Sequence, residues 1–164
     1  MERCAEELVI RVGMGEGAVS RRPEAVLVAP GLGSCVAVVL HSPRPLLGGM
    51  AHVMLPRAFG GSFGPFKFAD TAIPALLRAF ESAGADPEGI AVRLVGGAAM
   101  FGLPPDSPLN VGERNLRAVR DQLRARGLRV RAEAVGGSVS RTVCLYVGSG
   151  RVVVRTAGGE EAEL

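Results

Sequence analysis

The sequence predicts an α+β fold in which packed mixed β-sheets are flanked by two main helices. Two observations support this: eight short segments are rich in β-branched residues, and only two long segments have helical periodicity. Strands and helices do not alternate, so a β-α-β arrangement is not expected. The 164 residues suit a single domain spanning 1–164, and we expect residues 157–164 to be frayed.

The first predicted helix lies within residues 69–85. Asp70 or Thr71 can cap its start, Pro74 falls near its first turn, and Gly84 ends it. Its apolar residues recur at helical spacing on one face: Ile73, Leu76, Leu77 and Phe80.

The second predicted helix spans residues 110–127. Asn110 and Glu113 have the spacing of a capping box, and Gly127 ends the helix. Its apolar face carries Leu116, Val119 and Leu123, and its opposite face is charged.

The predicted strands account for most of the remaining chain. They are residues 8–12, 25–28, 36–40, 49–53, 90–95, 130–134, 142–147 and 152–156. The last two are a hairpin candidate because Gly148 and Gly150 permit a tight reversal. Two loops remain, 56–68 and 101–110, and the first of them is long enough to border a site.

Composition excludes several classes of function. A net charge of +3, spread along a chain with only 4% aromatic residues, argues against nucleic-acid binding. No apolar run reaches the roughly 18 residues that span a membrane, and the N-terminus lacks a signal peptide, so we expect a soluble protein without membrane insertion. Three irregularly spaced cysteines fit a reducing cytoplasm, not a disulfide framework or a zinc site.

Cys35 lies in the segment APGLGSCVAVVL, between a glycine-rich corner and an apolar run. Gly31 and Gly33 allow a tight turn, so the N–H groups around Ser34 and Cys35 can point into one concavity and stabilise an oxyanion. A thiol becomes a strong nucleophile when an imidazole or positive potential favours its thiolate. The same pattern is also typical of a small buried hydrophobic residue.

His52 is the candidate base. If the strands 36–40 and 49–53 pair antiparallel, the end of the second lies beside the start of the first, which brings His52 close to Cys35 and leaves His41 at the opposite end. A histidine on an apolar strand is also typical of a core residue. Cys4, near the terminus, and Cys144, inside a strand, are interpreted as non-catalytic.

Two glycine pairs are interpreted as sites of close backbone packing near the thiol. They occur in GGAAMF (96–101) and GGSVSR (136–141), and neither has the pattern of a phosphate-binding loop or a dinucleotide fingerprint.

Six motifs in order resemble the CheD family of chemoreceptor glutamine deamidases. They are GLGSCVAV with Cys35, AHVMLP with His52, KFADTAI, GGAAMF, NVGERN and GGSVSR. The resemblance covers most of the chain and implies a fold similar to the cytotoxic necrotizing factor deamidases. It implies that Cys35 is the nucleophile and His52 the general base and acid, with Gly33 and Ser34 in the oxyanion loop. Lys67, Thr71, Gly96 and Gly97 are expected to border the site.

The implied reaction converts glutamine side chains of methyl-accepting chemoreceptors to glutamate through a thioester, with no metal or organic cofactor. The substrate would be the receptor's cytoplasmic helices. In the family a threonine typically lies six residues before the nucleophile, where this chain has Ala29. Ser34, Thr71, a backbone carbonyl or water would then have to replace its hydroxyl.

Three hypotheses follow. The first, which we favour, is an active receptor deamidase in the cytoplasm. The second is a binding module that regulates a CheC-like phosphatase of the phosphorylated response regulator, and Ala29 is the feature that supports it. The third is a cysteine amidohydrolase that acts on another amide.

Overall fold

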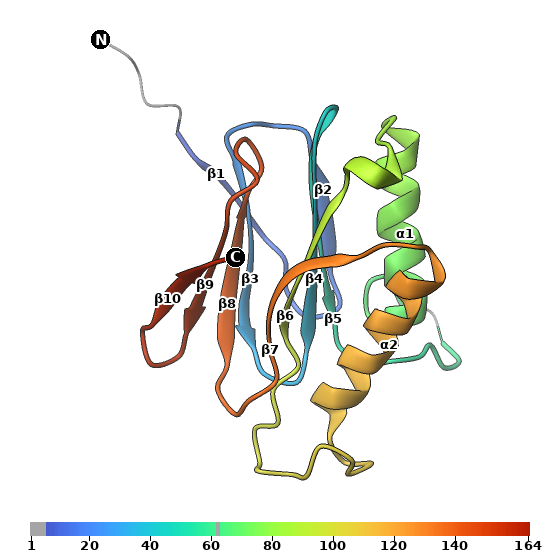
Figure 1. Ribbon diagram of the computed structural model, residues 1–164, viewed down its shortest axis with the longest axis vertical. Helices are drawn as coiled ribbons and strands as arrows, with labels where there is room; N and C mark the ends of the chain where they lie inside the picture. Colours follow the sequence, from blue (N-terminus) through green and yellow to red (C-terminus); the bar gives the residue numbers. More distant parts are fainter. Residues whose placement is uncertain (1–5, 62) are drawn as a thin grey trace.

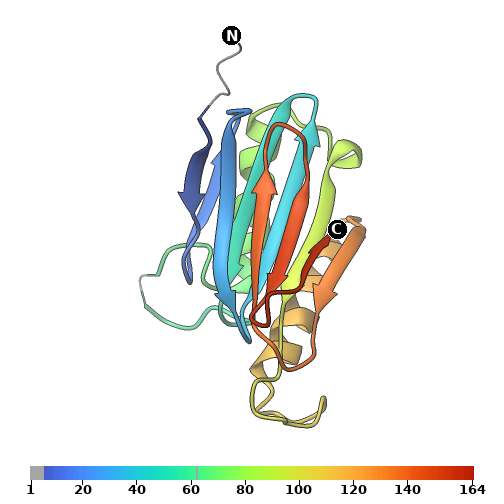
Figure 2. The same ribbon diagram turned by 90° about the vertical axis from the view of Figure 1, so that its left-hand side faces the viewer.

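Two five-stranded β-sheets lie face to face, and both long helices cover the outer face of one of them (Figures 1 and 2). The computed structural model describes residues 6–61 and 63–164. Cys4 therefore lies outside the described residues. The predicted α+β class, with packed mixed sheets and two main helices, is confirmed.

The first sheet has the strand order β1-β3-β8-β9-β10. Strands β1 and β3 are parallel, and the other neighbours are antiparallel. The hairpin predicted from the glycines is confirmed as β8 and β9. The bounds are β1 (Leu8–Arg11), β3 (Ala25–Leu32), β8 (Arg141–Tyr146), β9 (Val152–Thr156) and β10 (Glu161–Glu163).

The second sheet has the order β2-β5-β4-β6-β7, with β6 and β7 parallel. Its central strand β4 is antiparallel to both β5 and β6. All eight predicted strands are present in the two sheets, and four of them are longer than predicted. The bounds are β2 (Gly17–Ser20), β5 (Leu46–Val53), β4 (Val36–Pro43), β6 (Ala91–Gly96) and β7 (Val130–Val135).

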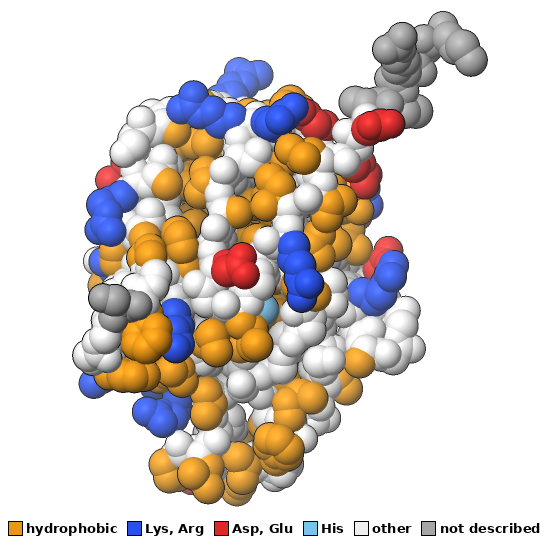
Figure 3. Space-filling view, turned by 180° about the vertical axis from the view of Figure 1, so that it is seen from behind, with side chains coloured by type: hydrophobic (Ala, Val, Ile, Leu, Met, Phe, Trp, Pro, Cys, Tyr) orange, Lys and Arg blue, Asp and Glu red, His pale blue; other side chains and the backbone are white. Residues whose placement is uncertain are grey.

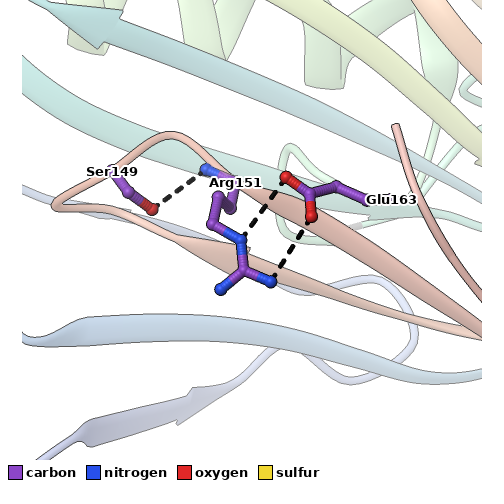
Figure 4. Close-up of polar contacts among 3 residues, drawn as sticks. All are labelled: Ser149, Arg151 and Glu163. Atoms are coloured by element: carbon purple, nitrogen blue, oxygen red, sulfur yellow. Dashed lines mark hydrogen bonds and ion pairs between the residues drawn. The ribbon is translucent and has the colours of Figure 1, made fainter.

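The prediction that residues 157–164 are frayed was wrong. Strand β10 pairs antiparallel with β9, and its side chains add ion pairs. Arg155 lies 2.8 Å from Glu161, and Arg151 contacts both carboxylate oxygens of Glu163 at 3.4 Å (Figure 4). The sequence Glu-Ala-Glu has no apolar alternation, so nothing in it indicates a strand. The segment is ordered instead by hydrogen bonds to the free edge of β9.

Helix α1 (Ala69–Ser82) begins without a side-chain cap, contrary to the prediction. Asp70 instead accepts a hydrogen bond from the Ala58 N–H at 3.0 Å, and the Thr71 hydroxyl donates to the Pro65 carbonyl at 2.6 Å. Both side chains are thus committed to the preceding loop. Pro74 lies inside the helix, beyond the first turn.

Helix α2 (Val111–Ala125) begins as predicted, with the Asn110 side chain accepting from the Glu113 N–H at 3.1 Å. The Asn110 N–H donates to the Ser107 carbonyl, so the reciprocal half of a capping box is not formed. One short 3-10 helix, η1 (Pro87–Gly89), precedes β6. Within the described residues, neither α1 nor α2 is long and apolar enough to cross a bilayer.

Strand β4 is buried on both faces, which divides the core into two layers. Ala37 and Val39 face the first sheet, while Val36, Val38 and Leu40 face the helices. This follows from the two-residue period of side chains along a strand. The layer between the sheets is the one that receives Cys35.

The Phe80 side chain has no exposed surface and packs in the layer between α1 and the second sheet. Removing such a ring leaves a cavity, so Phe80→Ala is expected to lower the free energy of unfolding by about 3–5 kcal/mol. Phe101 is 90% exposed, and Phe101→Ala is the matched control, with an expected change within about 0.5 kcal/mol. Urea unfolding measures both, and similar losses in the two variants would contradict the assigned core.

Candidate active site

The turn between β3 and β4 carries the chain from the first sheet to the second and ends at Cys35. The carbonyl groups of residues 33–35 in this turn all accept hydrogen bonds. Gly33 accepts from the Ala98 N–H at 2.9 Å, Ser34 from the Asn115 side chain at 3.0 Å, and Cys35 from the Gly97 N–H at 2.8 Å. The N–H groups of residues 33–35 donate to no described residue. They are therefore candidate donors for a ligand oxygen.

Gly31 has a φ of +61° where the β3–β8 register shifts. This left-handed conformation is the one that favours glycine, so the expected tight turn is present. Gly33 lies further along the turn, and a Cβ placed on it would be 3.4 Å from Cγ of Met100. The loop after β6 thus covers one side of the turn.

Of the two glycine pairs, Gly96 and Gly97 pack directly against this turn, whereas residues 136–137 hydrogen-bond to the segment 96–99 and not to the turn itself. A Cβ on Gly96 would collide with the Cys35 carbonyl oxygen. Gly136 donates to the Gly96 carbonyl at 3.0 Å, and the Gly137 carbonyl accepts from Ala99 at 2.9 Å. The two glycine pairs thus form a layered backbone support behind Cys35.

Cys35 carries a free, partly buried thiol at the start of β4. It packs against the core between the sheets, on the same side as Ala37. Cys144 lies in β8 between Val143 and Leu145, which both face that core, so its side chain is on the outer face of the first sheet.

His52 lies in β5, directly opposite Ala37 in the antiparallel ladder. Cys35 precedes Ala37 by two residues, which makes it a diagonal neighbour of His52 on one face of the sheet. The predicted pairing of the two strands is therefore confirmed.

His41 was expected in a turn but lies within β4, buried, with Nε2 2.8 Å from the Val147 carbonyl oxygen. It is six residues from Cys35, or about 20 Å along the strand. His41 therefore remains far from the thiol, as predicted.

The His52 ring is 1% exposed and has two different nitrogens. Nδ1 lies 3.0 Å from the Val12 carbonyl oxygen. A carbonyl only accepts, so Nδ1 donates the proton of this hydrogen bond. Nε2 has no hydrogen-bond partner among the described residues, Cys35 included. In the neutral ring, this tautomer leaves an unused lone pair on Nε2.

Burial shifts the pKa values of Cys35 and His52 in opposite directions. It raises the pKa of the Cys35 thiol, because the thiolate is poorly solvated there. It lowers the pKa of His52, an effect larger than the opposing ones of the Val12 carbonyl and the Glu16 carboxylate. Both directions favour a neutral thiol beside a neutral imidazole, not a thiolate–imidazolium pair.

Ala29 lies in β3, fully buried in the core between the sheets. Its methyl group offers no hydrogen bond, and the group that orients the His52 ring is a backbone carbonyl, Val12. The Thr71 hydroxyl does not contact the ring; its partners are the Pro65 and Phe68 carbonyls at the start of α1. The hydrogen bond to the His52 ring therefore comes from a backbone carbonyl and from no hydroxyl among the described residues.

The expected border residues separate into two groups. Gly96 and Gly97 contact Cys35 directly. The Lys67 carbonyl accepts from Met54 at 2.9 Å, just beyond His52, while its Nζ lies 3.8 Å from the centre of the Phe63 ring. Thr71 lies against a hollow that contains neither Cys35 nor His52.

The surface beside the thiol turn is apolar. Met100, Phe101 and Leu109 are 44%, 90% and 71% exposed and lie in the loop between β6 and α2. With Ser34 they line a hollow of about 110 Å³. Figure 3 shows hydrophobic side chains gathered at the lower end of the molecule, the end where this loop lies in Figure 1.

Sequence reasoning missed two residues of this site. Val12 acts through its carbonyl, which every residue has, so no sequence signal identifies it. Asn115 is fully buried, and its amide donates to the Ser34 and Met54 carbonyls. Its signal was present: Asn115 precedes Val119 by four residues and so lies on the apolar face of α2.

Comparison with known sequences identifies the family. A sequence model described as CheD chemotactic sensory transduction matches residues 54–156. The chain belongs to the CheD family. This confirms the resemblance seen in the six motifs.

Among the described residues no cluster of three or more His, Cys, Asp or Glu side chains is placed to hold a metal ion.

Several CheD relatives align over nearly the whole chain. The chemoreceptor glutamine deamidase CheD of Thermotoga maritima is 41% identical, covering 92% of this chain and 93% of that protein. The probable chemoreceptor glutamine deamidase CheD of Desulforamulus reducens is 40% identical, covering 96% of each chain. The corresponding protein of Archaeoglobus fulgidus is 40% identical, covering 93% of this chain and 96% of that protein.

Among solved structures, the Bacillus licheniformis protein YfiH is 15% identical with a TM-score of 0.49, covering 80% of this chain and 60% of that one. The likeness to the cytotoxic necrotizing factor fold stays a prediction.

The raised pKa of Cys35 predicts slow alkylation at neutral pH. The rate of Cys35 modification by iodoacetamide should rise with pH through a midpoint above the ordinary thiol value of about 8.5, because only the thiolate reacts. Peptide mass mapping separates Cys35 from the other cysteines, and the same protein in denaturant is the control. A midpoint at or below the ordinary value would show a preformed ion pair instead.

Proposed function

We propose that this CheD protein hydrolyses the side-chain amides of glutamine residues in chemoreceptors to glutamate, with Cys35 as the nucleophile and His52 as the base. The observation that carries the proposal is the His52 ring, which is buried and oriented by Val12, with Nε2 unpaired, on the sheet face that carries Cys35. The substrate class is that of the relatives, which are named chemoreceptor glutamine deamidases.

The first step is attack of the sulfur on the glutamine carboxamide carbon. Because both groups rest in their neutral forms, His52 Nε2 takes the thiol proton as the carbon–sulfur bond forms. The carbonyl oxygen becomes an oxyanion, and the free N–H groups of Gly33, Ser34 and Cys35 are the donors for it.

The second step breaks the carbon–nitrogen bond. The His52 imidazolium returns its proton to the departing nitrogen, ammonia leaves, and a thioester joins the substrate to Cys35. His52 then removes a proton from water, which attacks the thioester and releases glutamate and the thiol. The overall change is one amide and one water to one carboxylic acid and one ammonia, with no redox change.

The product carries a negative charge where the substrate had a neutral amide. A new carboxylate changes the charge of the receptor helices and provides a group that methylation can neutralise. The substrate site is thus in the cytoplasmic helices of the receptor, and we place this protein in the cytoplasm with them.

A second candidate function rests on Ala29. The family's hydroxyl is absent there, and the position is closed by the core. A protein that kept the fold and bound a CheC-like phosphatase would tolerate this substitution. Binding to such a partner with no conversion of receptor glutamine, even at long incubation, is the result that distinguishes this function.

Incubation of the protein with a receptor cytoplasmic fragment should release ammonia and convert defined glutamines to glutamate. Cys35→Ala should remove the activity, and His52→Ala should lower kcat by at least about 100-fold, because it removes the proposed acceptor of the thiol proton. Peptide mass mapping measures the conversion. Cys144→Ala is the matched control and should retain full activity, whereas an unchanged yield in Cys35→Ala would refute the proposal.

Ala29→Thr tests the importance of the missing hydroxyl. Val12 already orients the His52 ring, so the variant should change kcat by less than about tenfold. Turnover of the receptor fragment by the two proteins, at equal folded fraction, is the measurement. A wild type without activity beside an active Ala29→Thr variant would favour the binding function instead.

A further inference from the structure

Asn115 links the two strands of the site from outside the sheet. Its amide nitrogen donates to the Ser34 carbonyl at 3.0 Å and to the Met54 carbonyl at 2.8 Å. Ser34 immediately precedes Cys35, and Met54 follows His52 by two residues. One side chain from helix α2 therefore contacts both segments that carry the proposed chemistry.

The two hydrogen bonds of Asn115 lie just beyond the end of the β4–β5 ladder, where the two strands are no longer paired. The β4–β5 ladder ends with the pair Val36 and Val53. The next positions along the two strands are Cys35 and Met54, and Asn115 binds the carbonyls at this end of the ladder. The bridge thus extends the pairing of the two strands beyond their last ladder pair.

The helix that carries Asn115 is seated directly on the support of the thiol turn. A Cβ built on Gly112 would lie 2.5 Å from the Ala98 carbonyl oxygen and 2.6 Å from that of Gly97. Gly97 and Ala98 in turn donate to the carbonyls of Cys35 and Gly33. The first turns of α2 are therefore in close contact with the loop that holds residues 33–35.

Asn115 is costly as a packing residue. It has no exposed surface, and its Oδ1 has no partner among the described residues. A buried acceptor without a hydrogen bond disfavours the folded state. Its helix neighbours Leu116 and Val119 fill the same layer with apolar groups. The two donated hydrogen bonds are what distinguish Asn115 from an apolar residue here.

The Ser34 carbonyl and the Cys35 N–H belong to one planar, trans peptide unit, so they point in opposite directions. A donor that holds the carbonyl on the α2 side therefore directs the N–H to the other side. The Cys35 N–H is one of the free donors assigned to the oxyanion.

We propose that Asn115 is a positioning residue for the deamidation reaction: it aims the Cys35 N–H at the developing oxyanion and sets the spacing between the Cys35 and His52 segments. The inference rests on the proposed function. Asn115 touches no reacting atom and acts through the peptide between Ser34 and Cys35 and through the Met54 carbonyl.

Two substitutions of similar size test this role. Asn115→Asp replaces the donating amide by an acceptor that repels both carbonyls, and Asn115→Leu removes the polar group. In each, kcat for a receptor fragment should fall by about 10–100-fold at equal folded fraction, with KM changed by less than about threefold. Asn115→Ser retains one donor and should recover part of kcat.

Iodoacetamide alkylation of Cys35 distinguishes a misdirected Cys35 N–H from a displaced Cys35 thiol. Alkylation needs the thiolate but no oxyanion donor, so its rate should change by less than about threefold in variants that lose turnover. A large change in alkylation would show that the thiol itself is displaced and would overturn the oxyanion role.

Asn110→Ala is the matched control, because Asn110 is a buried asparagine that caps the same helix without contacting Ser34 or Met54 carbonyls. It should lower stability and leave kcat per folded molecule unchanged.

An active wild type with unchanged kcat in both Asn115→Asp and Asn115→Leu would overturn this inference alone. Failure of all three Asn115 variants to fold would assign the residue to stability and overturn it too. A wild type without turnover would refute the proposed function, and this inference with it.

Discussion

The antiparallel pairing of β4 with β5 is the constraint on which the site depends. The register that sets His52 opposite Ala37 also sets Val36 opposite Val53, so the thiol at the start of one strand and the imidazole at the end of the other lie at the same end of the ladder. A slip of one residue would turn His52 to the helix layer, because neighbouring side chains of a strand point to opposite faces. Burial of β4 on both faces prevents that slip, since each residue from Val36 to Leu40 packs into one of two apolar layers.

The same burial determines the electrostatics of the site. The layer between the sheets disfavours both the thiolate and the imidazolium, so the two groups rest uncharged. Backbone groups then supply the polarity that side chains do not: the Val12 carbonyl orients the ring, and the N–H groups of residues 33–35 offer donors at fixed positions. Such preorganised dipoles stabilise developing charge without reorganising when it appears. The core therefore disfavours resting charge, and in the proposed reaction the N–H groups of residues 33–35 stabilise the charge that forms.

Much of the architecture was readable from local patterns. The β-branched segments predicted all eight main strands, and the spacing of Ile73 to Phe80 and of Leu116 to Leu123 predicted both helices. The missed elements, β2 and β10, are short and carry little apolar periodicity, since each is ordered mainly by the edge of a neighbouring strand. The start of α1 was also mispredicted, because Asp70 and Thr71 bind the loop before the helix instead of its own N–H groups.

By itself, the sequence determined the candidate groups for the proposed chemistry and the strand pairing that relates them: a thiol after a glycine turn, and a histidine on the adjacent strand. Only the tertiary structure decided how those groups are held. The Val12 carbonyl comes from the residue that follows β1 of the opposite sheet, and the Asn115 amide comes from a helix 81 residues beyond Ser34 in the chain. Backbone carbonyls and long-range contacts leave no local pattern, because any residue has a carbonyl and its partner is chosen by how the layers pack.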